Sequence, residues 1–577
     1  MSYNNTKLVA GLLGYALLAC NISGCSFDSF SKTATETSSE NSSSATEITY
    51  LNADDMFTDR DKEVGYDEDT ATAITLSDNA SSCDSSSVSI SDNTITITDE
   101  GTYLLTGSLS DGQVIVNAND KKVQLVLDSV DINCDTSAAL YVKAADKVFV
   151  TLASDSENTL SNTNDFVAID DNNIDAVIFS KDDLTLNGSG TLTVTAKYGH
   201  GIVSKDDLVI TSGTYQITAA KHALSGQDSV RIADGILTLN AGTDGIHSEN
   251  TDDDTKGFIY IANGDISITT DSDGFDAEET LQVDGGNIEV YAGDDGLHSD
   301  DDLIITAGTI NVTKSYEGLE GMTVTIEDGD ISVVSSDDGI NASGDGSSGD
   351  SSSDTKDSSA DNNSGDTNAN DSNTKGSNSN KKDDFTPPSG EDKKTPPNGN
   401  AGPGDGNGGP GGSNGGLGGG NGGPGGGIEE ATDYNLIQIS GGKIYINASG
   451  DGIDSNGNLT VTGGEIYVDG PTSGGDGALD CSGTALISGG TVIAVGSSGM
   501  SENFDSSSAQ GSIFTTVSDS MITGDITLTD SDGNTIVSYS PSKEYSSIVI
   551  SCADLKEEKD YTLVAGDTNT SVSLDQK

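Results

Sequence analysis

Tryptophan is absent from this chain, and aromatic residues of any kind make up only 5% of its 577 residues. Basic residues are also scarce, because 26 Lys and Arg stand against 94 Asp and Glu and leave a net charge of -68. A nucleic-acid-binding protein needs a basic surface that neutralises phosphates, so this class is excluded. Only 33% of the residues are hydrophobic, which argues against the thick core of a conventional globular enzyme.

Proline is almost confined to one region, since seven of the nine prolines lie between residues 344 and 433. Elsewhere nearly every backbone N–H remains available for a β-ladder. Glycine, in contrast, is abundant, with 72 residues. This composition is typical of either disorder or a thin, repetitive β-structure.

The N-terminus carries a short apolar run at residues 8–19, which has the length of a signal peptide and is too short to cross a membrane. It is followed by Ile22-Ser23-Gly24-Cys25, which resembles the lipobox of bacterial lipoproteins. We therefore expect residues 1–24 to be a lipoprotein signal peptide and Cys25 to be the site of lipid attachment. The exported protein would be held at the bacterial surface by this lipid alone, with residues 25–59 as a flexible tether. The alternative is an ordinary signal peptide with incidental cysteines.

A repeat of about 22 residues runs through the middle of the chain. Its turn has the form acidic-Gly-apolar-x-small, as in DGIHS at 244–248, DGFDA at 273–277, DGLHS at 295–299 and DGIDS at 451–455. Strands of period two follow each turn, as in Ile288-Glu289-Val290. Two or three short strands in each 22-residue unit predict a parallel β-helix, an all-β solenoid whose coils stack about 4.8 Å apart.

The repeat also predicts the domain organisation. Gly329 and Gly442 occupy equivalent positions but are separated by a long stretch rich in Ser, Asn, Asp and Gly. We therefore expect one β-helix interrupted by a disordered insert, with the boundaries 60–343 for the first part, 344–433 for the insert and 434–499 for the last coils. Residues 500–577 lose the repeat and are predicted to form a C-terminal β cap, with a hairpin at 526–539.

Four cysteines lie beyond the N-terminal segment, at Cys83, Cys134, Cys481 and Cys552. Their spacing matches no zinc motif, and in an exported protein they could form up to two disulfides or remain buried thiols. The sequence leaves both alternatives open.

Stacking of the coils places the residues before the turn glycines in one column, which begins with His200 and His222 and then becomes acidic. Neighbouring carboxylates about 5 Å apart repel one another, so a cation is expected among them. Oxygen ligands outside the cell favour Ca²⁺. The predicted calcium ligands, which include two preceding acids, are Asp244, Asp273, Asp294, Asp295, Glu317, Asp337, Asp338, Asp451 and Asp476.

A second column lies two residues after the turn glycines and supplies further candidates for ligand binding. Its members are His247, Asp276, His298, Glu320 and Asp454, with Asn341 between the last two. We interpret His247 and His298 as polar turn residues and not as zinc ligands, because no cysteine joins them. The alternative for both columns is that Asp-Gly is favourable turn chemistry and the acids form a solvated face.

These turns and the GG-x-I-x-V strands resemble those of the bacterial carbohydrate-binding β-helix family that is related to pectate lyases. The segment from Gly101 to Ile132 and the Gly-rich insert are also similar, and the resemblance covers roughly residues 60 to 570. It implies a right-handed parallel β-helix, bound calcium and non-catalytic recognition of acidic polysaccharide such as polygalacturonate. Cellulose is a weaker candidate, because tryptophan is absent.

Three other functions stay open. A calcium-dependent polysaccharide lyase needs a basic residue that removes a proton, and Arg231 with Lys205 and Lys221 nearby are the candidates. A two-carboxylate glycoside hydrolase is compatible with so many acids, although their abundance makes any chosen pair uninformative. A surface adhesin or spacer would use calcium only to stiffen the stack. We expect a monomer without catalytic activity.

Overall fold

The computed structural model describes residues 48–344, 432 and 434–574. Every regular element in this part of the chain is a β-strand, which confirms the predicted all-β class. A search of the same residues finds no helix long and apolar enough to cross a membrane. The strands form one sheet of 39 strands and a separate sheet of four strands near the C-terminus.

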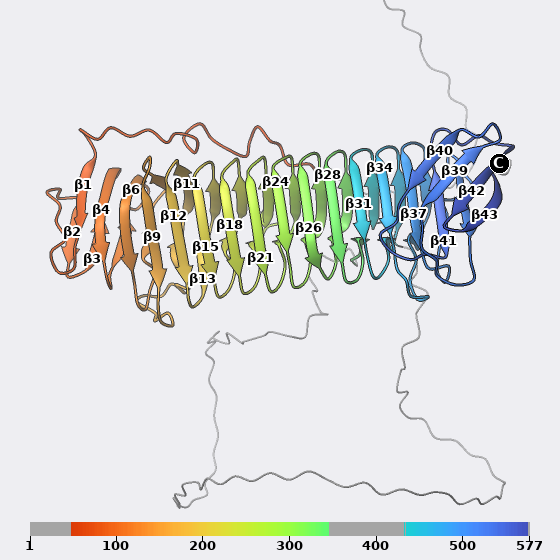
Figure 1. Ribbon diagram of the computed structural model, residues 1–577. Coiled ribbons are helices and arrows are strands. Elements are labelled where there is room, and N and C mark those ends of the chain that lie inside the picture. The colour runs from red at the N-terminus through yellow and green to blue at the C-terminus, as the bar shows by residue number, and fades with distance from the viewer. Residues whose placement is uncertain (1–47, 345–431, 433, 575–577) are drawn as a thin grey trace, which may run out of the picture. The chain divides into compact units, whose positions relative to one another are not determined.

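The large sheet consists of three ladders of mostly parallel strands, and Figure 1 shows successive coils lying side by side in chain order. Ladder 1 follows the Asp-Gly turns and contains β2 (Val88–Ser91), β3 (Thr94–Ile97), β5 (Gln113–Asn117), β7 (Leu140–Ala144), β10 (Ala176–Ser180), β13 (His200–Ser204), β16 (Leu224–Gly226), β19 (Ile246–Ser248), β22 (Phe275–Ala277), the start of β25 (Leu297–Ile305), the start of β27 (Leu319–Ile326), β29 (Ile340–Ala342), β32 (Ile453–Ser455) and β35 (Asp480–Cys481). Ladder 2 contains β1 (Thr72–Leu76), β4 (Gly101–Leu109), β6 (Lys122–Asn133), β8 (Lys147–Leu152), β11 (Asp183–Gly188), β14 (Asp207–Ile210), β17 (Ser229–Ile232), β20 (Phe258–Ile261), β23 (Thr280–Val283), the ends of β25 and β27, β30 (Leu436–Ile439), β33 (Asn458–Val461) and β36 (Ala485–Ile487). Ladder 3 contains the end of β6, β9 (Glu157–Asn162), β12 (Thr191–Ala196), β15 (Thr214–Ala219), β18 (Ile236–Ala241), β21 (Asp265–Thr270), β24 (Asn287–Tyr291), β26 (Thr309–Ser315), β28 (Asp330–Ser335), β31 (Lys443–Asn447), β34 (Glu465–Asp469) and β37 (Thr491–Gly496).

Equivalent residues of successive coils lie opposite one another in these ladders. In ladder 3, Ile266 pairs with Ile288, and Ile288 pairs with Ile310. All three side chains are at most 2% exposed, and burial of each contributes about 1.5–3 kcal/mol. The pairing is compatible with the predicted β-helix, whereas its right-handedness and a constant coil of about 22 residues stay predictions.

The turn glycines are required by the close approach of neighbouring coils. A Cβ atom added to Gly245 would lie 2.6 Å from the carbonyl oxygen of Gly274, the equivalent glycine of the next coil. The same distance separates a Cβ at Gly339 from the carbonyl oxygen of Gly452. Since real Cβ atoms do not approach a backbone oxygen so closely, no larger residue fits without a shift of the backbone.

The ladders continue directly across the long insert. Ile331 of β28 pairs with Ile444 of β31, and Ile340 of β29 pairs with Ile453 of β32. Coils far apart in the sequence are therefore neighbours in the stack. The predicted insert at 344–433 lies, apart from residues 344 and 432, outside the described residues, as do the predicted signal peptide and Cys25.

Residues 48–62, which we call the N-terminal strap, lie along the outer side of ladder 2 (Figure 1). The strap contacts outward side chains of ladder 2, among them Lys147, Arg231 and Gln282. Gln282 and Leu51 exchange two hydrogen bonds, of 2.7 Å to the Leu51 N–H and 3.4 Å to its carbonyl oxygen. The end of the segment predicted as a flexible tether is therefore packed from residue 48 onward, because the sheet offers partners for its backbone.

The C-terminal region ends the parallel stack. β41 (Ser547–Ser551) pairs antiparallel with β37 and with β38 (Ser512–Thr516). The second sheet has the order β40 (Thr535–Tyr539), β39 (Ile526–Asp530), β42 (Lys559–Ala565) and β43 (Thr568–Leu574), and it contains the predicted hairpin at 526–539. Cys83, Cys134, Cys481 and Cys552 are free thiols.

Candidate functional site

The acidic column forms a hydrogen-bonded series along the Asp-Gly turns. The backbone N–H of Asp273 donates to Asp244 Oδ1 at 3.2 Å, and the N–H of Asp295 donates to Asp273 Oδ1 at 2.7 Å. Equivalent bonds join the N–H of Glu317 to Asp295 Oδ1 at 2.9 Å and the N–H of Asp451 to Asp338 Oδ1 at 2.6 Å. One oxygen of each accepting carboxylate thus holds the next coil, and the other oxygen is left for a different partner.

The two predicted columns meet in groups of three side chains. In each group, one ligand atom per residue lies within 4.8 Å of the others. The groups are Asp244–Asp273–Asp276, Asp273–Asp295–His298, Asp295–Glu317–Glu320, Asp338–Asp451–Asp454 and His222–Asp244–His247. Three of them, at Asp276, Glu320 and Asp454, contain only carboxylates contributed by neighbouring coils.

Burial and crowding disfavour the charged form of these acids. Burial, with repulsion from Glu320 and Asp273, raises the pKa of Asp295 to about 10. Burial and Glu320 likewise raise the pKa of Glu317 to about 8. Asp244 behaves differently, because hydrogen bonding and attraction from His222 outweigh its burial and lower its pKa. A cation among the carboxylates would relieve the repulsion.

Three of the predicted calcium ligands are not members of these groups: Asp294, Asp337 and Asp476. Asp476 is bonded instead by the Ser473 hydroxyl at 2.9 Å. His222, which the sequence placed in the column but not among the metal ligands, is a member of one group. Its position before the turn was visible in the repeat, but its proximity to His247 depends on the stacking of coils.

Arg231 does not have the exposure that a catalytic base needs. It points outward from ladder 2, between the buried Val230 and Ile232, but the N-terminal strap covers it. Its guanidinium donates to the Met56 carbonyl oxygen at 3.1 Å and forms an ion pair with Asp207. Only 13% of the side chain is exposed, so substrate could reach it only after displacement of the strap.

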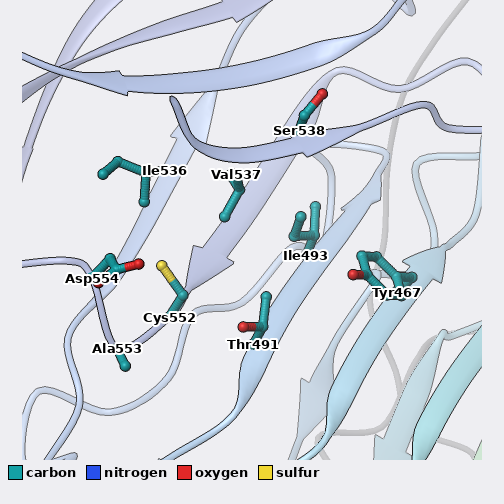
Figure 2. Close-up of a pocket in the computed structure, with 9 residues that line it drawn as sticks. All are labelled: Tyr467, Thr491, Ile493, Ile536, Val537, Ser538, Cys552, Ala553 and Asp554. Atoms are coloured by element: carbon teal, nitrogen blue, oxygen red, sulfur yellow. The ribbon is translucent and has the colours of Figure 1, made fainter. Parts of the chain in front are cut away.

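A pocket of about 310 Å³ lies between the last coils and the C-terminal region. Its walls, shown in Figure 2, are Tyr467, Thr491, Ile493, Ile536, Val537, Ser538, Cys552, Ala553 and Asp554. None of these residues belongs to the acidic column. The pocket has one carboxylate and no histidine, so its lining does not resemble a metal site.

Comparison with known proteins gives a family and a relative. The model of the family described as carbohydrate-binding domain-containing protein matches residues 91–339 and 292–352. A protein of Acetivibrio thermocellus with the same description is 38% identical over 135 residues, which cover 23% of this chain and 47% of the relative. The chain therefore matches about half the length of that relative.

A solved structure of a polysaccharide lyase-like protein from C. thermocellum, a gadolinium derivative, is 33% identical and has a TM-score of 0.40. The similarity covers 41% of this chain and 97% of that protein. The family model and the relative carry the same description, so the predicted resemblance to carbohydrate-binding domain-containing proteins is confirmed over residues 91–352.

Proposed function

We propose that this protein is a non-catalytic, carbohydrate-binding protein of the cell surface that captures acidic polysaccharide through calcium ions held at its Asp-Gly turns. The description of its family supports the binding of a carbohydrate. Calcium and a polygalacturonate-like ligand are the finer parts of the proposal, and they depend on the chemistry of the turns.

The observation that carries the proposal is the convergence of carboxylates from neighbouring coils. Asp295, Glu317 and Glu320 form one group, and a second group of the same kind surrounds Asp451. Such all-oxygen sets fit Ca²⁺, which prefers six to eight oxygen ligands in flexible geometry. When bound, calcium would supply positive charge and open coordination positions for uronate carboxylates.

An anionic ligand needs such a cation. The chain has a net charge of -68 and would repel a polyuronate over any distance at which charges are unscreened. Calcium at the turns reverses the sign of the local field and bridges the two sets of carboxylates. A regular column of turns also matches a polymer that repeats its own carboxylates.

The cellular setting is part of the same proposal. A signal peptide at 1–24 and lipid on Cys25 would place a monomeric, right-handed β-helix outside the cell, where calcium is plentiful. The apolar run at 8–19 and the Ile22-Ser23-Gly24-Cys25 motif support the anchor. Loss of radiolabelled lipid incorporation in a Cys25→Ser variant would test it.

The decisive experiment is a calorimetric titration of the full-length protein with polygalacturonate, first in calcium and then in excess EDTA. Ultraviolet absorbance is followed in the same mixtures, because a lyase forms an unsaturated product. We expect binding in calcium, no binding in EDTA and no rise in absorbance. A rise in absorbance would make the protein a lyase, and absence of binding in calcium would leave a calcium-stiffened spacer.

A pair of matched variants locates the site. Glu320→Gln keeps the size of a side chain in the all-carboxylate group, and Asp330→Asn changes an exposed acid at the start of β28. We expect Glu320→Gln to weaken calcium-dependent binding about tenfold or more and Asp330→Asn to leave it within about twofold. Equal affinities of the two variants would contradict the proposed site.

A further inference from the structure

Three histidines from successive coils are stacked at one end of the acidic column. The ring of His222 lies 4.7 Å from that of His200 and 4.4 Å from that of His247, measured between centroids. The second pair is almost parallel, with 6° between the rings. Farther along, the acidic column contains only Asp and Glu, and His298 in the second column is the one remaining histidine of the chain. Nitrogen ligands are therefore concentrated at this end.

Carboxylates lie beside the ring nitrogens of His222 and His247 at distances typical of a metal site. His222 Nδ1 lies 2.7 Å from Asp244 Oδ2, which in turn lies 3.7 Å from His247 Nδ1. Asp276 Oδ2 is 2.8 Å from the same nitrogen of His247. A tetrahedral zinc site with bonds of about 2.0–2.1 Å separates its ligand atoms by about 3.3 Å. The three measured separations, 2.7, 2.8 and 3.7 Å, lie on both sides of that value.

The short contact between His222 and Asp244 needs either a proton or a metal ion between the two atoms. His222 Nδ1 lies 3.3 Å from the backbone nitrogen of Asp244 and 3.0 Å from the Thr243 hydroxyl oxygen, and the tautomer of the ring decides whether it donates or accepts. A carboxylate oxygen 2.7 Å from an acceptor nitrogen is repulsive unless a proton or a metal ion lies between the two atoms. Asp244 Oδ1 is already bonded to the next coil, so Oδ2 is the oxygen that would bind the ion.

The surroundings support a site of this kind. His247 Nε2 lies 3.6 Å from a carboxylate oxygen of Glu249, which is longer than a hydrogen bond but close enough for a charge interaction. His200 is 9% exposed, its ring stacks on His222, and its Nδ1 has no hydrogen-bond partner. The ring of His200 therefore lies on the face of His222 opposite His247.

Solvent reaches the group through a pocket of about 250 Å³. The pocket is lined by Lys205, Ser225, Gln227, His247, Glu249, Thr251 and Asp252. An ion therefore has an entry path that ends at His247. The charge of Lys205 opposes a cation, but Glu249 and Asp252 on the same wall and the acids of the group outnumber it.

We propose that His222, Asp244 and His247 form a binding site for a divalent transition metal such as zinc, with Asp276 as a fourth ligand. This assigns to a transition metal Asp244, which the sequence predicts as a calcium ligand, and His247, which the sequence predicts as a polar turn residue. Two imidazoles and carboxylates are the mixed nitrogen and oxygen set that such metals prefer, whereas the all-carboxylate groups farther along the column suit calcium. Because the rings of His222 and His247 are nearly parallel, coordination by both Nδ1 atoms requires the imidazoles to rotate about χ2, a soft torsion. The metal would join three consecutive coils.

The test is a calorimetric titration of the full-length protein with zinc chloride, in excess calcium chloride and after alkylation of the thiols. Cobalt absorption spectra report the coordination geometry independently. We expect one zinc ion to bind, a tetrahedral cobalt spectrum, and affinities at least about 100-fold lower in His222→Asn and His247→Asn. His298→Asn, which alters the histidine of a mostly acidic group, serves as the matched control and should bind within about threefold of the native protein.

Circular dichroism and thermal unfolding establish that each variant is folded, and zinc should raise the Tm of the native protein but not of His222→Asn. Equal zinc affinities in all four proteins, or displacement of zinc by an equal concentration of calcium, would overturn the proposal. The outcome is separable from the proposed function, because polygalacturonate binding is measured in calcium without zinc. His222→Asn should retain that binding.

Discussion

Each residue of the Asp-Gly turn has its own structural task. The aspartate accepts a backbone N–H from the next coil, as Asp244 does from Asp273, and the glycine leaves space for that coil's carbonyl oxygen. Favourable turn chemistry therefore explains part of the pattern without any ligand. It does not explain why acids of the second column join the same groups, so the metal proposals depend on that convergence.

The requirement for glycine is testable at Gly245. A Cβ atom there would clash with Gly274, so Gly245→Ala should destabilise the protein by about 1–3 kcal/mol. Urea unfolding followed by circular dichroism measures the change. Gly65→Ala is the control, because nothing lies within 4 Å of a Cβ at Gly65. Equal unfolding midpoints for the two variants would contradict the close approach of the coils.

A second residue-scale prediction concerns pH and lies outside the metal groups. Burial, followed by a hydrogen bond with Asp228, raises the pKa of Asp206 to about 7. A carboxyl whose pKa is raised by folding stabilises the protein while it is protonated, and that stability is lost as the pH rises from about 4 through about 7. Asp206→Asn cannot ionise and should escape this loss.

Differential scanning calorimetry at pH 5 and pH 8.5 provides the measurement. We expect the Tm of Asp206→Asn to exceed that of the native protein by about 1–2 °C at pH 8.5 and to equal it at pH 5. A variant that is less stable at both pH values would show that the ionised Asp206 is favourable in the fold.

At the scale of elements, the N-terminal strap is held at its far end by a buried ion pair. Lys147 Nζ lies 2.9 Å from Asp61 Oδ1, and the Thr185 hydroxyl donates to the same oxygen at 2.7 Å. Burial would raise the pKa of Asp61, but the hydrogen bonds from Lys147 and Thr185 lower it to about 2. The carboxylate is therefore charged at any physiological pH and fastens the strap to β8 and β11.

Removal of this carboxylate should release the strap. Asp61→Ala leaves the buried Lys147 only the more distant Asp183, at 3.7 Å, as a carboxylate partner. The strap should then be cleaved about tenfold faster in limited proteolysis while the coils stay intact. Mass spectrometry of the fragments locates the cleavage. Glu63→Ala, at an exposed position two residues on, should be cleaved at the native rate. Unchanged cleavage of Asp61→Ala would show that the strap is held by its other contacts.

At the scale of the whole molecule, the stack behaves as one structure although its sequence is interrupted. Gly344 lies beside Asn435, with 3.9 Å between a Cβ at Gly344 and Asn435 Nδ2, so the ends of the long insert are close together. Replacement of residues 345–431 by a short Gly-Ser linker should leave the Tm unchanged or raise it slightly, because a shorter loop costs less entropy to close. A fall of more than about 5 °C in calorimetry would mean that the insert stabilises the coils.

Much of this organisation could be read from the sequence, because a solenoid repeats the same local solution in every coil. The spacing of the Asp-Gly turns and the alternation in segments such as Ile288-Glu289-Val290 predicted the all-β class and the two columns, and the register of the ladders agrees with the columns. Stacking at a constant distance converts a sequence period into proximity in space. The repeat alone therefore aligned residues more than 20 positions apart.

Only the tertiary structure decided the contacts that do not repeat from coil to coil. The strap over Arg231 comes from a segment with no periodicity, and nothing in the sequence pairs Met56 with an arginine 175 residues away. The closeness of His222, Asp244 and His247 depends on the directions of side chains from two neighbouring coils. A repeat places such residues in a column but does not orient their side chains. Period and composition determined the fold and the acidic column, because those depend on local geometry. The burial of side chains, their contacts and their access to solvent depended on the folded chain. They arise between distant segments, and nothing in the sequence of one segment indicates that it contacts the other.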